Sequence, residues 1–531
     1  MTFKTLVAEY ITQLNTQGIE VDAESPFQLS GQSTLMLNSK DWAIAAEQAK
    51  ISGWRWAGLW GDPFTEFCHI YVVLAHTAGH LLLQTQVSWQ APELASHTPW
   101  YPGADRIERH TQDLLGIVFT NHPSNTRWTR HQAWSASQYP LRLDFPVEGQ
   151  SLHRTKSDTT YPFKRVEGSG VYEIPVGPVH AGIIEPGHFR FQAVGETVYA
   201  LEERLGYVHK GIEKIAVGKT PNELAKLAGR VSGDSTVSHT WAACQAMEQA
   251  MACQVSARSL HIRALLAERE RVANHLGDIG AICNDVGFAF MHLQCASLRE
   301  NWQRTNHQLF GNRLLMDTIV PGGVAVDLSA ENLRRLHQEH QQLIEQTKDL
   351  FAIIADNASL NDRLLSTGYL SHEDAVELGC TGYVAKASGL RQDLRHHQAY
   401  APYDQLKMTI PVFAQGDVAA RVQVRVEEVG VSLALMDQLL DTLPAGEILT
   451  LFLNNTQTAQ TASGLGKIEG WRGEILSYVR FDSAGHIARY FPLDPSWFLW
   501  PALERLIDGN IVADFPVCNK SVNGSYAGHD L

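Results

Sequence analysis

The stretch from residue 180 to residue 188 collects side chains that could hold or move protons. It contains His180, Glu185 and His188. Apolar neighbours would reduce the hydration of Glu185 and raise the pKa of this carboxyl, which could then exchange protons near neutrality. A solvated hairpin carboxylate or a helix-capping acid explains Glu185 equally well, so both interpretations stay open.

A second polar cluster lies in a short turn ahead of an apolar helix. It consists of Arg230, Ser232, Asp234, Ser235 and His239. Serine or aspartate before a helix is also an ordinary cap, so capping alone is an alternative interpretation. Caps rarely need an arginine as well, which favours a turn that faces a ligand.

The cysteines show no pattern of a disulfide framework or a metal site. Their number is odd, their spacing is irregular and no C-x-x-C occurs among Cys68, Cys244, Cys253, Cys283, Cys295, Cys380 and Cys518. Four fall in segments patterned as buried helix, where a free cysteine commonly serves as a small apolar residue.

Length and charge restrict the class of protein. A chain of 531 residues exceeds one hydrophobic core, so two or more domains are expected. The net charge of -14 comes without a basic block, which argues against a nucleic-acid partner. No apolar run approaches the roughly 18 residues of a membrane-spanning helix. The first 17 residues predict an amphipathic helix rather than a signal peptide.

The elements that must position the polar residues change character along the chain. Residues 1 to about 155 alternate strand-like runs and turns, with two strands, Ile70–Leu74 and His80–Val87, joined through Gly79. Residues 150–163 are polar and lack periodicity, which favours a linker. Residues 221–350 show the 3.6-residue period of long helices.

The last part of the chain mixes element types. Residues 405–531 combine helix, Gly-rich turns and a strand-like run at Val422–Val426. The fold class predicted from the whole pattern is α+β: an N-terminal α+β module, then a mostly α-helical domain with a peripheral mixed sheet.

Several motifs carry a resemblance to a known family. Pro102–Pro123 and Tyr139–Pro146 resemble the complex I subunit that docks on the large quinone-site subunit. The following stretches are similar to the large subunits of complex I and of membrane-bound energy-converting nickel-iron hydrogenases: Val176–Phe191, Arg204–Ala216, Gly229–Met251, Arg263–Gly280, Pro321–Val324, Gly379–Leu406 and Trp471–Ile475. The resemblance implies a docking-subunit-like domain at 1–155 and a large-subunit-like domain at 165–531.

The resemblance also implies where nickel ligands would stand. Hydrogenases of this family hold their metals with two C-x-x-C motifs, and the first aligns here with Ser232 and Ser235. For the second, Cys518 and Ser521 offer the nearest spacing. Serine is a poor ligand for soft metals, so we expect no bound metal and no hydrogenase activity, with Cys518 the only surviving thiol near a former ligand position.

In complex I the corresponding cleft receives a quinone, and the resemblance implies three residue roles. A hairpin histidine is assigned to His188, an aspartate to Asp285, and a tyrosine is replaced by Gly233. The candidate catalytic residues are therefore Glu185, His188 and Asp285. The candidate cavity residues are His180, Arg230, Ser232 and Ser235.

Two functions follow from the resemblance. The first is an oxidoreductase subunit, peripheral on the cytoplasmic face of a membrane, whose quinone-type cavity receives electrons from an iron–sulfur cluster in a small partner subunit. Antiporter-like membrane subunits would then move ions, and the chain itself would bind no cofactor except, in this function, a quinone. The alternative is a coupling or structural subunit that has lost its redox site.

Overall fold

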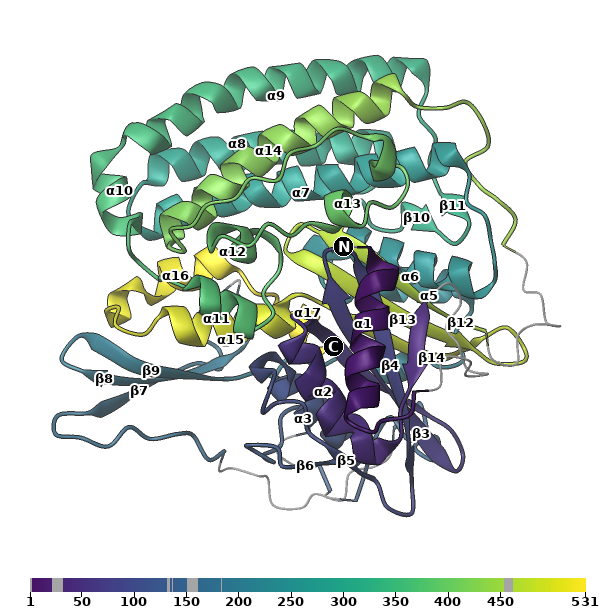
Figure 1. Cartoon of the computed structure of the whole chain (residues 1–531). Helices are drawn as coiled ribbons and strands as arrows, with labels where there is room; N and C mark the ends of the chain where they lie inside the picture. Colours follow the sequence, from purple (N-terminus) through teal and green to yellow (C-terminus); the bar gives the residue numbers. More distant parts are fainter. Residues whose placement is uncertain are drawn as a thin grey trace.

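A computed structural model describes residues 2–21, 32–130, 134–135, 137–149, 161–182, 184–452 and 462–531 (Figure 1). A helical bundle forms one side of the molecule and the N-terminal module the other, with a three-stranded sheet and the last helices between them. This arrangement confirms the predicted α+β class. Among the described residues, no helix combines the length and apolarity needed to cross a membrane.

The N-terminal module is built on a four-stranded sheet of order β1-β4-β3-β2, in which only the β1–β4 pair is parallel. Its strands are β1 (Ser33–Met36), β2 (Arg55–Pro63), β3 (Phe67–His76) and β4 (Gly79–Ser88). The predicted hairpin through Gly79 is confirmed. Strands β2 and β3 are buried along nearly their whole length, as expected for a sheet covered on both faces.

Helices and short strands complete the module. The amphipathic helix predicted at the N-terminus is confirmed as α1. The elements are α1 (Phe3–Thr16), η1 (Ser39–Asp41), α2 (Trp42–Ile51), β5 (Glu93–Ala95), η2 (Pro102–Ala104), α3 (Asp105–Leu115) and β6 (Val118–Thr120).

Four long helices form the bundle, and three of them agree with the periodicity of residues 221–350. They are α7 (Ala257–Asp285), α8 (Ala289–Phe310), α9 (Ala330–Asp356) and α14 (Val418–Asp441). Helix α7 lies against α8 and α14, and is buried all round over most of its length. Side-chain caps at Ser256, Ser329 and Asp417 fix the starts of α7, α9 and α14.

The strand predicted at Val422–Val426 is wrong, because these residues lie inside α14. The alternation of valine with Gln423 and Arg425 imitates a half-exposed strand. Arg425 is nevertheless fully buried, since its Nε donates to Asp278 Oδ2 over 3.1 Å. A helix that buries a paired charge therefore loses the polar face by which a helical period is recognised.

The sheet between the bundle and the module consists of β12 (Ser463–Gly470), β13 (Gly473–Phe481) and β14 (Ile487–Leu493). It packs on α6 (Thr236–Ala250) through glycines. A Cβ atom at Gly464 or Gly466 would lie about 2 Å from a carbonyl oxygen of α6, so only glycine allows this approach.

A second three-stranded sheet projects from the molecule in Figure 1: β7 (Tyr172–Val176), β8 (His188–Val194) and β9 (Thr197–Arg204). The remaining elements are α4 (Ile212–Ile215), α5 (Pro221–Ala228), η3 (Gly233–Ser235), β10 (Ile319–Val320), β11 (Gly323–Val324), α10 (Ala358–Leu364), α11 (His372–Glu377), α12 (Gly382–Ala387), α13 (Leu394–His397), η4 (Tyr403–Gln405), α15 (Ser496–Leu506), η5 (Val512–Asp514), α16 (Phe515–Val522) and α17 (Tyr526–Asp530).

Buried ion pairs join the N-terminal module to the rest of the chain. Arg106 of α3 pairs with Glu203 and Glu504. In addition, Asp62 of β2 accepts two hydrogen bonds from Arg480 of β13. Most of the predicted linker, residues 150–160, lies outside the described residues, and the division at about 155 stays a prediction.

Candidate functional site

Two adjoining cavities lie at the C-terminal end of α7. One, of about 300 Å³, is lined by Glu185 and by the turn at residues 232–234. The other, of about 320 Å³, is lined by His180 and Asp285. We call them together the paired cavity, because both are lined by Ile184, Lys520, Asn523, Gly524 and Tyr526.

A hydrogen-bonded cluster closes the first half of the paired cavity. Arg472, from the turn between β12 and β13, donates to both oxygens of Asp234 over 2.7 and 2.6 Å. The Ser232 hydroxyl donates to Asp234 over 2.7 Å and lies 2.8 Å from the Ser525 hydroxyl. Burial would raise the pKa of Asp234, but the charge of Arg472 outweighs it and lowers this pKa to about 2. Asp234 is therefore ionised and held in place.

These contacts correct the expected position of the second metal-ligand motif. Ligands of one bimetallic centre must converge, and the residue that meets Ser232 is Ser525, not Cys518. Gly528 follows Ser525 at the same x-x spacing and donates its N–H to the Ser525 hydroxyl over 2.9 Å. The positions where the resemblance implies four metal-ligating cysteines are therefore matched here by Ser232, Ser235, Ser525 and Gly528.

Cys518 and Ser521 of α16 serve another purpose. Arg421 of α14 donates through Nε to the Ser521 hydroxyl over 2.9 Å. The buried Cys518 thiol faces Gly368, where an added Cβ would lie 2.8 Å from its sulfur. Burial raises the pKa of Cys518 to about 12, so the thiol stays neutral and packs as an apolar group.

A tyrosine–histidine pair stands in the second half of the paired cavity. The hydroxyl of Tyr526 lies 3.4 Å from Nε2 of His180, and the two rings are neighbours. Tyr526 is 6% exposed, and burial raises its pKa above the ordinary range, so its hydroxyl remains protonated and able to donate.

Two charged groups complete this half. Asp285, the last residue of α7, is exposed toward solvent, yet neighbouring protein atoms reduce its hydration and raise its pKa despite the opposing charge of Lys520. Lys520 is half-buried and lines both halves of the cavity. Among the described residues, it has no ion pair within 4 Å.

Glu185 faces the first half of the paired cavity, and its contact matches the helix-capping alternative. Its Oε2 accepts the backbone N–H of Ala527 over 3.0 Å, at the first turn of α17. The side chain is exposed. It therefore lies beside the cavity without the apolar enclosure that the sequence indicated.

Three candidates lie outside the lining of the paired cavity. His188 is buried in β8 with its Nδ1 3.4 Å from the Gly177 carbonyl oxygen and its ring against Phe163. Arg230 is half-exposed and engaged by Asp317 in a bidentate ion pair. Ser235 is buried behind Asp234, where Arg472 reaches its hydroxyl over 3.2 Å. The histidine that lines the cavity is His180.

Sequence reasoning missed Tyr526, Lys520 and Ser525. All three lie within the last twelve residues, which carry no cysteine pair to mark a motif. The gap of two residues between Ser525 and Gly528, which equals that of a C-x-x-C motif, was the one signal in the sequence that could have marked this segment.

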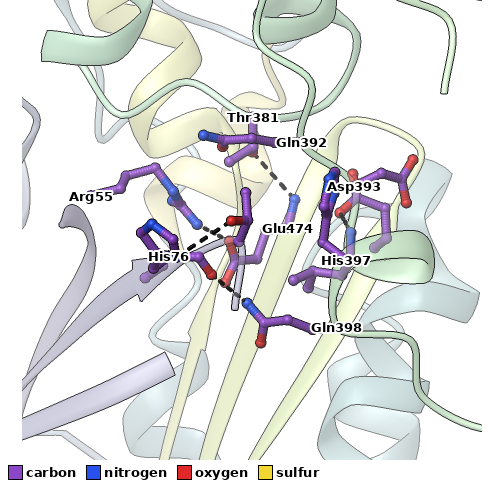
Figure 2. A pocket seen from close by; sticks show the side chains of 12 residues that line it. Arg55, His76, Thr381, Gln392, Asp393, His397, Gln398 and Glu474 are labelled. Atoms are coloured by element: carbon purple, nitrogen blue, oxygen red, sulfur yellow. Dashed lines mark hydrogen bonds and ion pairs between the residues drawn. The ribbon is translucent and has the colours of Figure 1, made fainter. Parts of the chain in front are cut away.

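A smaller cavity of about 40 Å³ lies between the N-terminal module and the large-subunit-like region. Figure 2 shows Arg55 and His76 facing Thr381, Asp393 and Glu474 across it. The remaining lining residues are Ala75, Thr77, Gln392, Leu394, His397, Gln398 and Glu469. Arg55 pairs with Glu474, and Gln398 donates to the His76 carbonyl over 2.8 Å, so the module is joined here by polar contacts.

Family comparisons agree with this geometry. The chain matches "Respiratory-chain NADH dehydrogenase, 49 Kd subunit" over residues 285–530 and the 30 Kd subunit over residues 43–151. Residues 210–277 match "Nickel-dependent hydrogenase".

Individual relatives divide between the same two classes. The carbon monoxide-induced hydrogenase of Rhodospirillum rubrum is 30% identical over 66% of this chain and 97% of its own length. Formate hydrogenlyase subunit 5 of Escherichia coli (strain K12) is 29% identical over 86% of this chain and 81% of its own. The C/D subunit of the NADH-quinone oxidoreductase of Phocaeicola vulgatus is 29% identical over 73% of this chain and 78% of its own.

A solved structure shows the same relationship. A chain in the structure of the membrane-bound sulfane sulfur reductase (MBS), an archaeal respiratory membrane complex, is 26% identical, with a TM-score of 0.64 over 70% of this chain and 100% of that one. The chain thus belongs to the family of large subunits shared by complex I and membrane-bound hydrogenases. Within it, the chain is a fused form that carries the 30 Kd and 49 Kd regions together and is a subunit of a complex I-like or hydrogenase-related assembly.

The residues present do not fit the nickel-iron centre of this family. None of the four ligand positions carries a thiolate, and an added Cβ at Gly528 would lie 2.7 Å from the Asp494 carboxylate. Across the residues that the structure describes, no group of three or more His, Cys, Asp or Glu side chains could hold a metal ion. At two of the ligand positions, Ser232 and Ser235, the neighbouring group is the Arg472–Asp234 ion pair.

Proposed function

We propose that the chain is the acceptor-site subunit of a membrane-associated complex I-like assembly and that the paired cavity binds a quinone-type electron acceptor. The observation that carries this proposal is the Tyr526–His180 pair beside Asp285. We infer that Tyr526 and His180 take the roles of the family's tyrosine, which Gly233 lacks, and of its hairpin histidine, which the sequence assigned to His188.

The chemistry of the cavity suits a quinone. Reduction adds two electrons and two protons, which convert the two carbonyls of the ring into hydroxyls. The Tyr526 hydroxyl and the His180 ring can hydrogen-bond one carbonyl, and Asp285 can supply a proton. The apolar lining of Val176, Ile184 and Phe515 suits the ring.

We assign the source of electrons to an iron–sulfur cluster in a small partner subunit. The ligand positions of this chain have lost their thiolates, and its described residues form no other group that could hold a metal. The assembly would lie on the cytoplasmic face of a membrane, where antiporter-like subunits use the reaction to move ions. The solved relative, a chain of an archaeal respiratory membrane complex, supports a place in a membrane-associated assembly.

A second acceptor class is favoured by one observation. Lys520 lies in both halves of the paired cavity with no ion pair among the described residues, which suits an anionic acceptor such as a polysulfide. The relative solved as a sulfane sulfur reductase makes this chemistry relevant.

Binding of a soluble short-chain quinone and of polysulfide to the full chain, purified with its partner subunits, tests the proposal. We expect Tyr526→Phe to weaken quinone binding by roughly 3- to 10-fold, the effect of about 1 kcal/mol for one hydrogen bond. Tyr199→Phe, on the exposed surface of β9, is the matched control and should change nothing. Polysulfide binding that depends on Lys520, with no quinone binding, would favour the second class. If neither quinone nor polysulfide binds, the result would favour the alternative of a coupling or structural subunit without a redox site.

A further inference from the structure

A buried carboxyl lies behind the turn that closes the paired cavity. Glu270 of α7 is 5% exposed. Its oxygens accept the N–H of Val237 over 2.7 Å, the N–H of Ser238 over 3.2 Å and the hydroxyl of Ser238 over 2.7 Å. All three donors belong to the first turn of α6, so Glu270 caps this helix from outside.

Capping does not explain a second feature, a small cavity of about 20 Å³ beside Glu270. This volume holds about one water molecule. Gly233 and Asp234 line both the small cavity and the first half of the paired cavity. An added Cβ at Gly233 would meet nothing nearer than Met316 Cε at 3.8 Å, so no neighbouring side chain packs against this position of the shared wall.

The other wall of the small cavity leads toward solvent. Gln303, Asn306, Arg313 and Leu314 line it, and the last two are half-exposed. Asn274 also lines this cavity, and its amide holds the turn against α7 by donating to the main-chain carbonyls of Asp234 over 2.7 Å and of Glu270 over 2.9 Å. A proton therefore has polar groups on both sides of Glu270.

The charges around Glu270 decide which group can donate. Burial raises the pKa of Glu270 to about 7, although its bonds from Ser238 and Val237 lower it, and the charge of Asp234 raises it further. Arg472 holds Asp234 ionised from the far side, and Arg313 faces the small cavity. Near neutrality Glu270 can give and regain a proton, whereas Asp234 cannot.

We propose that Glu270 delivers protons to the acceptor in the paired cavity through a water beside the Gly233–Asp234 turn. This inference rests on the proposed function. The acceptor takes electrons from the partner's iron–sulfur cluster, and one of its oxygens takes the proton that Glu270 loses. The Glu270 carboxylate then regains a proton from solvent on the Arg313 side.

Turnover of the assembled complex with a short-chain quinone, measured from pH 5.5 to 9, tests the inference. We expect Glu270→Gln to lower the rate about tenfold or more near pH 7 and to remove the loss of rate that accompanies deprotonation, with quinone binding unchanged. Glu223→Gln is the matched control, because Glu223 also caps a helix but lies on the surface of α5.

A second variant separates proton delivery from capping. Ser238→Ala removes a bond that lowers the pKa of Glu270 and leaves its carboxyl in place, so the falling limb of the pH profile should move to higher pH. The inference would be overturned if the falling limb of the pH–rate profile did not move in Ser238→Ala. It would also be overturned if Glu270→Gln folded and kept the wild-type pH–rate profile. A wild-type complex that binds no quinone would instead refute the proposed function.

Discussion

The hydroxyl of Ser232 lies 2.8 Å from the hydroxyl of Ser525, although 293 positions separate the two residues. The contact joins the turn before α6 to the start of α17, at the point where the family's metal-binding segments would converge. Three serines and a glycine occupy that point: Ser232, Ser235, Ser525 and Gly528. Without thiolates, these residues cannot hold a nickel-iron centre.

Nickel should therefore be absent from the purified protein, even when it is produced with nickel and hydrogenase maturation factors. Hydroxyls at Ser232, Ser235 and Ser525 are poor ligands for soft metals. Elemental analysis by inductively coupled plasma mass spectrometry measures this directly. A value close to one nickel per chain would contradict our interpretation of the site.

Gly528→Ala should destabilise the fold, because the new Cβ would lie 2.7 Å from the Asp494 carboxylate. That carboxylate cannot move freely, since it holds His239 over 2.8 Å and the N–H of Ser496. We expect a loss of about 1–3 kcal/mol in the free energy of unfolding. Gly233→Ala is the matched control, because its Cβ would meet only Met316 Cε at an ordinary contact distance of 3.8 Å, and urea denaturation of both variants should show a change only in the first.

Asp285→Asn should slow turnover by roughly 100-fold while leaving assembly intact, because the amide keeps the shape of the side chain and loses the proton that a carboxyl can transfer. Steady-state rates of the assembled complex measure the effect, and size-exclusion chromatography checks assembly. Asp362→Asn, on the exposed surface of α10, serves as the control. Wild-type turnover in Asp285→Asn would remove this residue from the mechanism.

Acid should weaken the contact between the N-terminal module and the rest of the chain. Burial raises the pKa of Glu474, but the charges of Arg55 and His80 outweigh it and lower this pKa to about 2. The folded-state pKa lies below the ordinary value, so this stabilisation is present above about pH 4.5 and is lost as pH falls toward 2.

Thermal unfolding of Glu474→Gln beside the wild type measures this contribution. The difference in stability should be constant above pH 5 and shrink as pH falls through that window. Glu377→Gln, on the exposed end of α11, is the control. A difference that stays constant down to pH 2 would show that Glu474 does not titrate in this way.

Limited proteolysis should cut first within residues 150–160, because this stretch is polar in sequence and we propose that it joins two separately folded domains. The two fragments should then elute together, since they share one apolar core, in which Trp60 of β2 stacks on Phe491 of β14. First cleavage within residues 229–280 would place the boundary elsewhere.

The elements that the sequence predicted well each have one strong local sequence pattern. The β3–β4 hairpin consists of two apolar runs joined through Gly79, and α7 and α8 are long and periodic. Helix α14 was misjudged because Arg425 is buried against Asp278, so its polar residues do not mark a solvent-facing side. Local pattern cannot reveal a pairing with a residue 147 positions away.

The site shows the same limit. Motif register pointed to the turn at Ser232 and the resemblance pointed to Asp285, and both line the paired cavity. The sequence alone could not locate Ser525. Where both cysteines of a C-x-x-C motif have been replaced, only the two-residue gap between the ligand positions remains, and many other pairs of residues share that gap. The hairpin histidine was assigned to His188, whereas His180, in the loop between β7 and β8, lines the cavity and lies next to Tyr526.

The polar contacts between the module and the large-subunit-like region have a consequence for how the protein is held together. Ion pairs such as Arg106–Glu203 and Arg480–Asp62 contribute little net attraction when two separate chains must first meet, since their desolvation opposes association. Within one polypeptide the module is present at an effective concentration on the order of millimolar beside its docking surface. Covalent fusion therefore fixes the ratio of the two parts at one to one and keeps the module at its docking surface at any dilution of the protein.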